Sequence, residues 1–171
     1  MVSKTLVGAI IGIVIIAAVA YLFFAPGSLT IQLTDPPPYS ANVQHIFVTF
    51  SKIEVHRVAN DSWVTIMGSE QTIDLKQSIN VTKVLATSTL ANGRYNEIRL
   101  FITSAVAVIG AKNVSLRVPS TAQTGLKIPV IPGGFEIKSA SSTVVLIDIR
   151  VRDTDLHNGL LTPALTARVI S

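Results

Sequence analysis

The chain's three histidines, His45, His56 and His157, are its candidates for a neutral-pH general base or a nitrogen metal ligand. Glu54 and His56 are two residues apart in an alternating segment, so their side chains share one face of a strand and could hold one ion together. Two ligands do not complete a metal site, and the spacing supplies no third. We therefore interpret this pair as exposed surface residues.

The most polar cluster is Asp153-Thr154-Asp155, followed by His157-Asn158-Gly159. Ca²⁺ loops also alternate acids with small residues, but this segment lacks the D-x-D-x-D-G spacing with a distal glutamate. The pattern favours a solvated turn between the last two strands, with Asp153 and Asp155 as the acids nearest to a cation site. Neither Ser120 nor Ser141 lies in a G-x-S-x-G elbow. We therefore predict no metal, no cofactor, no catalytic residue and no enzyme.

An uncharged run dominates the N-terminal part of the chain, because no Asp, Glu, Lys or Arg occurs between Lys4 and Asp35. An α-helix over Thr5–Ala25 would extend roughly 31 Å at about 1.5 Å per residue, close to the ~30 Å thickness of a bilayer core. This predicts a transmembrane anchor. The expected divisions are 1–4 as a cytoplasmic tip, 5–25 as the anchor helix, 26–28 as a linker and 29–171 as an extracytoplasmic domain.

Two alternatives to a retained anchor remain open. A cleaved signal peptide could end at Ala18-Val19-Ala20, although its apolar stretch is usually shorter than this one. A pilin-type leader could instead be cut near Lys4, which would leave the apolar helix to form a filament core. In the anchor interpretation, Gly8 and Gly12 form a small-xxx-small pattern for packing against a partner helix.

Lys4 and the amino terminus are the cationic flank of the run, which predicts a cytoplasmic N-terminus and a single-pass protein of the cell membrane. The expected exterior contains three Asn-x-Ser/Thr sequons, at Asn60, Asn80 and Asn113. The net charge of +4 is spread along the chain without a basic run, so nucleic acid is not expected as a partner. The absence of cysteine leaves packing and sheet pairing to stabilise the domain.

Period-two alternation recurs after residue 28, which predicts a mainly β domain of about seven to eight strands. Leu29, Ile31 and Leu33 mark the first strand, and Pro36-Pro37-Pro38 should end it. A strand from about Val43 to Val58 slips phase around Ser51-Lys52, which indicates a β-bulge, and 63–67 should complete a hairpin. A short helical crossover is expected within Ser78–Ala86. The expected fold is a two-sheet antiparallel sandwich, Ig-like or prealbumin-like.

Six blocks of sequence resemble a prokaryotic family catalogued as a domain of unknown function, whose members are exported, prealbumin-like β-sandwich modules. The blocks lie at Gly27–Pro36, Ile53–Ile66, Asp74-Leu75, Leu90–Leu100, Val118–Lys127 and Ile147–Ile149. The resemblance implies an exported, frequently membrane-tethered sandwich and brings no catalytic residues. Within the fourth block, Gly93-Arg94-Tyr95 has the chemistry of a tyrosine corner.

These observations favour a non-enzymatic, membrane-anchored subunit that supports a membrane or cell-surface assembly. Its expected partners are membrane lipid and other envelope proteins, reached through the anchor helix and the sheet edges. One alternative is a surface fibre or adhesive subunit joined by strand addition. Another is a glycan-binding module that stacks sugars on Tyr39, Trp63 and Tyr95.

Overall fold

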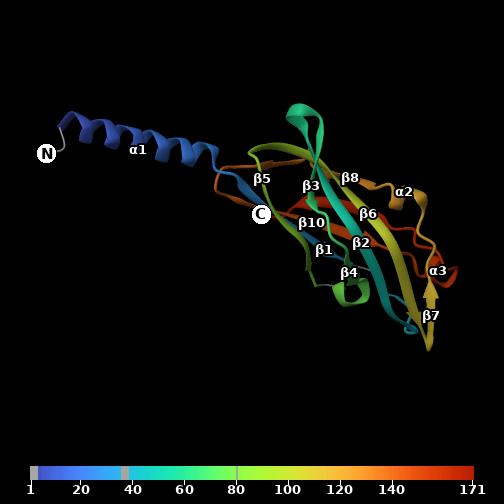
Figure 1. Ribbon diagram of the computed structural model, residues 1–171. Helices are drawn as coiled ribbons and strands as arrows, with labels where there is room; N and C mark the ends of the chain where they lie inside the picture. The colour runs from blue at the N-terminus through green and yellow to red at the C-terminus, as the bar shows by residue number, and fades with distance from the viewer. Residues whose placement is uncertain (1–3, 36–38, 80) are drawn as a thin grey trace.

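A computed structural model describes residues 4–35, 39–79 and 81–171. A helix, α1 (Lys4–Phe24), precedes the β-rich part of the chain and extends away from it (Figure 1). The strands are β1 (Gly27–Thr34), β2 (Val43–Arg57), β3 (Ser62–Met67), β4 (Gln71–Asp74), β5 (Lys83–Leu90), β6 (Gly93–Ile109), β7 (Lys112–Ser115), β8 (Leu126–Ile131), β9 (Phe135–Ile137), β10 (Ser142–Arg150) and β11 (Ala164–Val169). The short helical elements are η1 (Val58–Asn60), η2 (Leu75–Ser78), α2 (Ser120–Gln123) and α3 (Asp153–His157).

Among the described residues, the strands form one 11-stranded sheet in the order β3-β2-β6-β8-β11-β10-β1-β5. Strand β4 pairs with β2, and β7 and β9 pair with β6. The end strands β3 and β5 contact each other, so the sheet nearly closes on itself. The alternate apolar residues of each strand face inward, and this face forms the hydrophobic core.

The predicted fold class is right in being mainly β, but the described residues form 11 strands where seven to eight were expected. It is wrong in two further respects. The first concerns the sheet, which is continuous and mixed where two antiparallel sheets were expected. Strands β1 and β10 pair in parallel, as do β8 and β11, and the β8–β11 contact joins the two halves. Alternation along one strand specifies which face is buried but not the direction of the neighbouring strand.

The second correction concerns the expected transmembrane anchor at 5–25. No helix in the described part of the chain is both long and apolar enough to cross a bilayer. Helix α1, Lys4–Phe24, covers all but the last residue of this segment. Large apolar side chains along this stretch are exposed, including Ile13 and Ile16.

Local predictions within the β part are mostly confirmed. The slip in β2 occurs at Phe50, where the pairing with β6 shifts register, and β2 and β3 form the expected antiparallel hairpin. The helical crossover expected within Ser78–Ala86 is wrong, because 83–90 forms strand β5 on the free edge of β1. The three prolines at 36–38 lie outside the described residues.

Tyr95 forms the predicted tyrosine corner and is 1% exposed. Its hydroxyl donates to the carbonyl oxygen of Ala91 at 3.0 Å, and its ring stacks on Phe135 at 5.5 Å between centroids. Burial raises the pKa of the Tyr95 hydroxyl, so the group stays protonated and able to donate. The corner therefore fastens the start of the long strand β6 to the loop before it.

Candidate functional site

The sheet has an opening between β8 and β11. These two strands pair in parallel over two residue pairs, Ala167 with Val130 and Arg168 with Ile131. Continuing the register by one step would place Thr166 opposite Pro129. Proline has no N–H to donate to a ladder, so the pairing ends there and the strands part.

Where the β8–β11 pairing has ended, each of the two strands still pairs with the strand on its other side. From Leu126 to Pro129, β8 pairs with β6, and from Ala164 to Thr166, β11 pairs with β10. Within the described strands, neither segment has a strand partner on the side that faces the opening. Their backbone groups on that side are therefore available to an added chain.

The segment before β11 is held away from β8 by hydrogen bonds to a different part of the chain. The backbone N–H of Arg117 donates to Gly159 O at 2.8 Å, and the N–H of Leu161 donates to Arg117 O at 3.1 Å. Asp155 adds a second attachment, because its carboxylate accepts a hydrogen bond from the hydroxyl of Thr162. The opening is thus built into the backbone and does not depend on one side-chain position.

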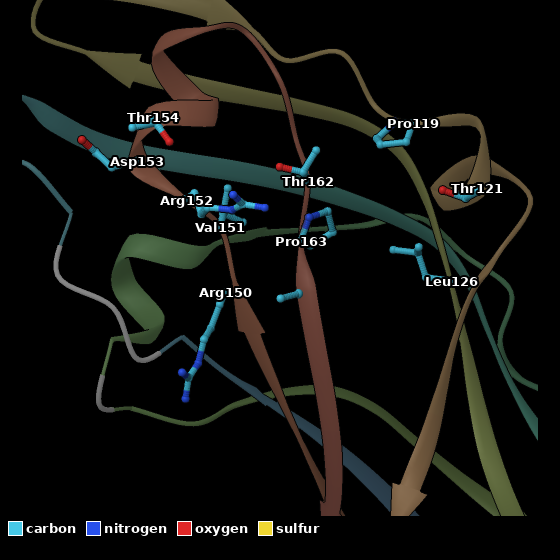
Figure 2. A pocket seen from close by; sticks show the side chains of 11 residues that line it. Pro119, Thr121, Leu126, Arg150, Val151, Arg152, Asp153, Thr154, Thr162 and Pro163 are labelled. Atoms are coloured by element: carbon cyan, nitrogen blue, oxygen red, sulfur yellow. The ribbon is translucent and has the colours of Figure 1, made fainter.

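A pocket of about 690 Å³ occupies the opening (Figure 2), within the size range of small-ligand sites. Its apolar lining residues are Pro119, Leu126, Val151, Pro163 and Ala164. Its polar lining residues are Thr121, Arg150, Arg152, Asp153, Thr154 and Thr162. They come from the ends of β8, β10 and β11 and from the adjoining α2 and α3.

A buried acid interacts electrostatically with Arg150, one of the residues that line the pocket. Asp35, 0% exposed, follows β1 and accepts a hydrogen bond of 2.6 Å from the hydroxyl of Tyr39. Its other oxygen, Oδ1, has no hydrogen-bond partner in the described structure. Burial raises the pKa of Asp35 from 3.8 to about 7; Asp148 adds to this, whereas the Tyr39 hydrogen bond and Arg150 act in the opposite direction.

The segment that starts at Tyr39 connects this acid to the pocket rim. Burial, followed by the hydrogen bond to Asp35, raises the pKa of Tyr39 above its ordinary range, so its hydroxyl remains a donor. One residue later, the Ser40 backbone N–H and hydroxyl donate to Asp153 Oδ1 at 3.2 and 2.9 Å. Asp153 lines the pocket, so its carboxylate serves as an anchor for this segment.

Sequence reasoning missed Asp35, although the signal was present. Leu29, Ile31 and Leu33 occupy alternate positions on the buried face of β1, and the next position in that phase is Asp35. An acid in an apolar phase is the pattern of a buried titratable group. The opening itself was also missed, although Pro129 lies within a segment that otherwise alternates as a strand.

The predicted pair Glu54 and His56 shares one face of β2. The interpretation as exposed residues is wrong for Glu54, which is buried, and both side chains are engaged. Glu54 lies 2.9 Å from Lys52 Nζ and 3.3 Å from Arg99 Nη1. The two ring nitrogens of His56 lie 2.8 Å from Asn96 Oδ1 and 2.8 Å from Asp61 Oδ1. In the described part of the chain, no three His, Asp or Glu side chains gather as ligands for a metal.

The other predicted site residues do not come together. Asp153 and Asp155 lie in α3, where the sequence suggested a turn, and both accept hydrogen bonds from neighbouring hydroxyls. Asn60 and Asn113 are exposed, and Asn80 lies outside the described residues. On α1, a Cβ atom at Gly8 or Gly12 would meet no described atom within 4 Å apart from the adjacent residues and the helix's own backbone.

The three aromatic residues expected to stack on sugars are separated. Tyr95 is in the core, and the hydroxyl of Tyr39 donates a hydrogen bond to Asp35. Trp63 lies on β3, where the guanidinium of Arg99 is 3.7 Å from the centroid of its ring. These three side chains therefore do not form a common aromatic platform.

The fold and the pocket define a mainly β protein with a ligand-sized opening in its sheet. The chain belongs to the family described as Domain of unknown function (DUF4382), whose model matches residues 26–160. The resemblance to a family of unknown function is thereby confirmed. No curated protein and no solved structure matches the chain.

Proposed function

We propose that this protein is a non-enzymatic accessory subunit that holds an extended segment of a partner protein in the opening between β8 and β11. The observation that carries the proposal is the end of the β8–β11 ladder at Pro129. Among the described strands, it leaves one side of each of two strand segments unpaired beside a pocket. Strand addition is a common mode of peptide recognition, in which backbone hydrogen bonds supply affinity and side-chain pockets supply selectivity.

The lining fits such a segment. The apolar side chains of Leu126 and Val151 and the ring of Pro163 offer contacts for a side chain that points into the pocket. The hydroxyl of Thr121 on the rim offers a polar contact, and the hydroxyl oxygen of Thr162, whose proton is donated to Asp155, can accept a hydrogen bond. We also propose a location for the β domain, which is outside the cytosol, as the resemblance to exported, prealbumin-like modules implies. Recovery of the chain from the cytosolic fraction alone would contradict that location.

A displayed library of short linear peptides tests the binding proposal with the full-length chain. A mild non-ionic detergent keeps the exposed apolar side chains of α1 from driving self-association. We expect enrichment of extended peptides that bind in solution. Methylation of alternate backbone nitrogens in those peptides should weaken binding at least about tenfold, because each blocked N–H removes a backbone hydrogen bond.

Pro129→Val tests the same backbone pairing from the side of the protein. Valine restores an N–H and favours strands, so the β8–β11 ladder should extend to Thr166 and narrow the opening. Peptide affinity should fall at least about tenfold, while the free energy of unfolding should rise by about 1 kcal/mol for the added pairing. Fluorescence polarisation and chemical denaturation measure the two effects.

Thr103→Val, on an exposed position of β6, introduces the same residue away from the opening and should leave affinity unchanged. Should Pro129→Val fail to fold, the backbone-methylated peptides still decide the question. The proposal is wrong if no linear peptide is enriched, or if binding is indifferent to both Pro129→Val and backbone methylation.

A further inference from the structure

The opening interrupts two rows of core side chains that run across the sheet, which bears on the sequence of the held segment; the inference rests on the proposed function. Continued past its last pair, the β8–β11 register sets Leu126 in line with Pro163. In the next row it sets Ile128 in line with Leu165. Ile128 is buried, whereas Leu126 and Leu165 are only partly buried against the core. The core therefore reaches the surface where β8 and β11 part.

Both rows are complete on the far sides of β8 and β11. Leu126 pairs with Leu100 of β6, and Leu165 pairs with Ile149 of β10, and both of these partners are 0% exposed. In Figure 2 the Leu126 side chain points from β8 into the gap. Alternate side chains of a strand point to the same face, so an added strand would place residues i and i+2 in the two gaps. Apolar side chains at these positions would complete both rows and remove Leu126 and Leu165 from water.

One outward-facing position lies between the two rows, and its neighbour on β8 is Lys127. Lys127 is exposed and stands opposite Arg99 of β6, a residue of the same charge. The Arg99 guanidinium is already engaged, 3.3 Å from Glu54 and 3.7 Å from the centroid of the Trp63 ring. Lys127 forms no ion pair with any residue that the structure describes, and its Nζ lies 5.6 Å from the centroid of the same ring.

An acidic side chain fits this outward position. Across the opening, the residue in line with Lys127 is Ala164, whose methyl group leaves room for a longer side chain. Opposite charges on facing strand residues are favourable, and like charges are unfavourable. A carboxylate opposite Lys127 would offset the two positive charges that Lys127 and Arg99 place side by side. The flexible four-carbon stem of Lys127 lets its amine leave the Trp63 ring for that carboxylate.

From this arrangement we infer that the segment held in the opening contains an apolar–acidic–apolar triplet. Its two apolar side chains complete the interrupted core rows, and its carboxylate faces Lys127. The pattern is the same in both chain directions, so it holds for a segment that runs parallel or antiparallel to β8 and β11.

The peptides enriched from the library are the probes for this inference, and we expect the triplet among them. Serine in place of either apolar residue should weaken binding at least about tenfold, because it removes buried apolar area. Lys127→Glu should weaken binding of the acidic peptide about fivefold, because an attraction becomes a repulsion. A peptide with lysine in place of the acid should bind Lys127→Glu more tightly than it binds the parent chain.

Lys83→Glu makes the same charge change at an exposed position of β5, three strands from β11 in the sheet, and should leave affinity unchanged. Circular dichroism verifies that each variant is folded. Should Lys127→Glu fail to fold, the lysine peptide still decides the question, because it should bind the parent chain about fivefold more weakly than the acidic peptide does.

Two outcomes separate this inference from the proposed function. If peptides bind in a manner sensitive to Pro129→Val but lack the triplet, or are indifferent to the charge at residue 127 and to their own acid, this inference is wrong and the proposed function stands. If no peptide binds, the proposed function itself is wrong.

Discussion

Replacing Asp35 with asparagine is expected to stabilise the protein at alkaline pH. Relative to the parent chain, the gain in unfolding free energy should grow by about 4 kcal/mol between about pH 4 and about pH 8.5. Asparagine keeps an oxygen that can accept the 2.6 Å hydrogen bond from Tyr39 and removes the charge from a side chain that is fully buried.

The direction follows from the raised pKa of Asp35. Burial moves this pKa from 3.8 in the unfolded chain to about 7 in the folded protein, so folding favours the protonated acid. The resulting stabilisation is complete below the unfolded value and is lost as the pH rises through the folded value. Around Asp35, Asp148 reinforces the shift, and Tyr39 and Arg150 oppose it.

Chemical denaturation at a series of pH values measures this effect. Glu136→Gln, which alters an exposed acid in β9, provides the control and should give a curve parallel to that of the parent chain. The Asp35→Asn curve should diverge from both as the pH rises. A constant difference between Asp35→Asn and the parent chain across this range would contradict the assignment of a buried, neutral acid.

Tyr95→Ala is expected to destabilise the protein by about 3 to 5 kcal/mol, the range for removing a buried aromatic side chain. The substitution removes the ring stacked on Phe135 and leaves the carbonyl of Ala91 without the hydroxyl donor. Tyr95→Phe keeps the ring and should cost only about 1 kcal/mol, since it loses the hydrogen bond alone.

Thermal and chemical unfolding distinguish these contributions. Tyr21→Ala, on an exposed face of α1, makes the same substitution and should change stability by less than about 0.5 kcal/mol. Equal losses for Tyr95→Phe and Tyr95→Ala would show that the hydroxyl, and not the ring, dominates. That result would contradict the role assigned to the stack with Phe135.

Features of the fold that depend on neighbouring residues could be predicted from the sequence. The alternation in β1 and the phase slip in β2 identified the buried faces, and the turn after β2 identified the hairpin with β3. The tyrosine corner was predictable for the same reason, since the Tyr95 hydroxyl bonds a carbonyl four residues away. Each of these features is encoded within a few residues of the chain.

Features that depend on distant pairing could not be predicted in this way. The segment that forms β5 has no strong alternation, and its strand conformation follows from the available edge of β1, more than fifty residues earlier. The parallel pairing of β1 with β10 likewise joins segments from opposite ends of the β domain. Local strand propensity does not specify which distant strand pairs with which.

The candidate site lies between these two cases. The buried position of Asp35 could have been predicted from the alternation of β1. Pro129 could have been identified as a residue that interrupts a β-ladder. What the sequence does not supply is the β8–β11 register, whose continuation would place Pro129 opposite Thr166. Without that register, the proline marks a weak strand and gives no indication of an opening or of the arginines beside it.

Hydrogen–deuterium exchange of the full-length chain, with and without an enriched peptide, tests the central claim most directly. If a partner segment adds to the free sides of β8 and β11, the peptide should slow exchange of those backbone amides in 126–128 and 164–166 that face the opening, because only these would gain a partner. Unchanged exchange in both segments at a saturating concentration of peptide would contradict strand addition at this opening.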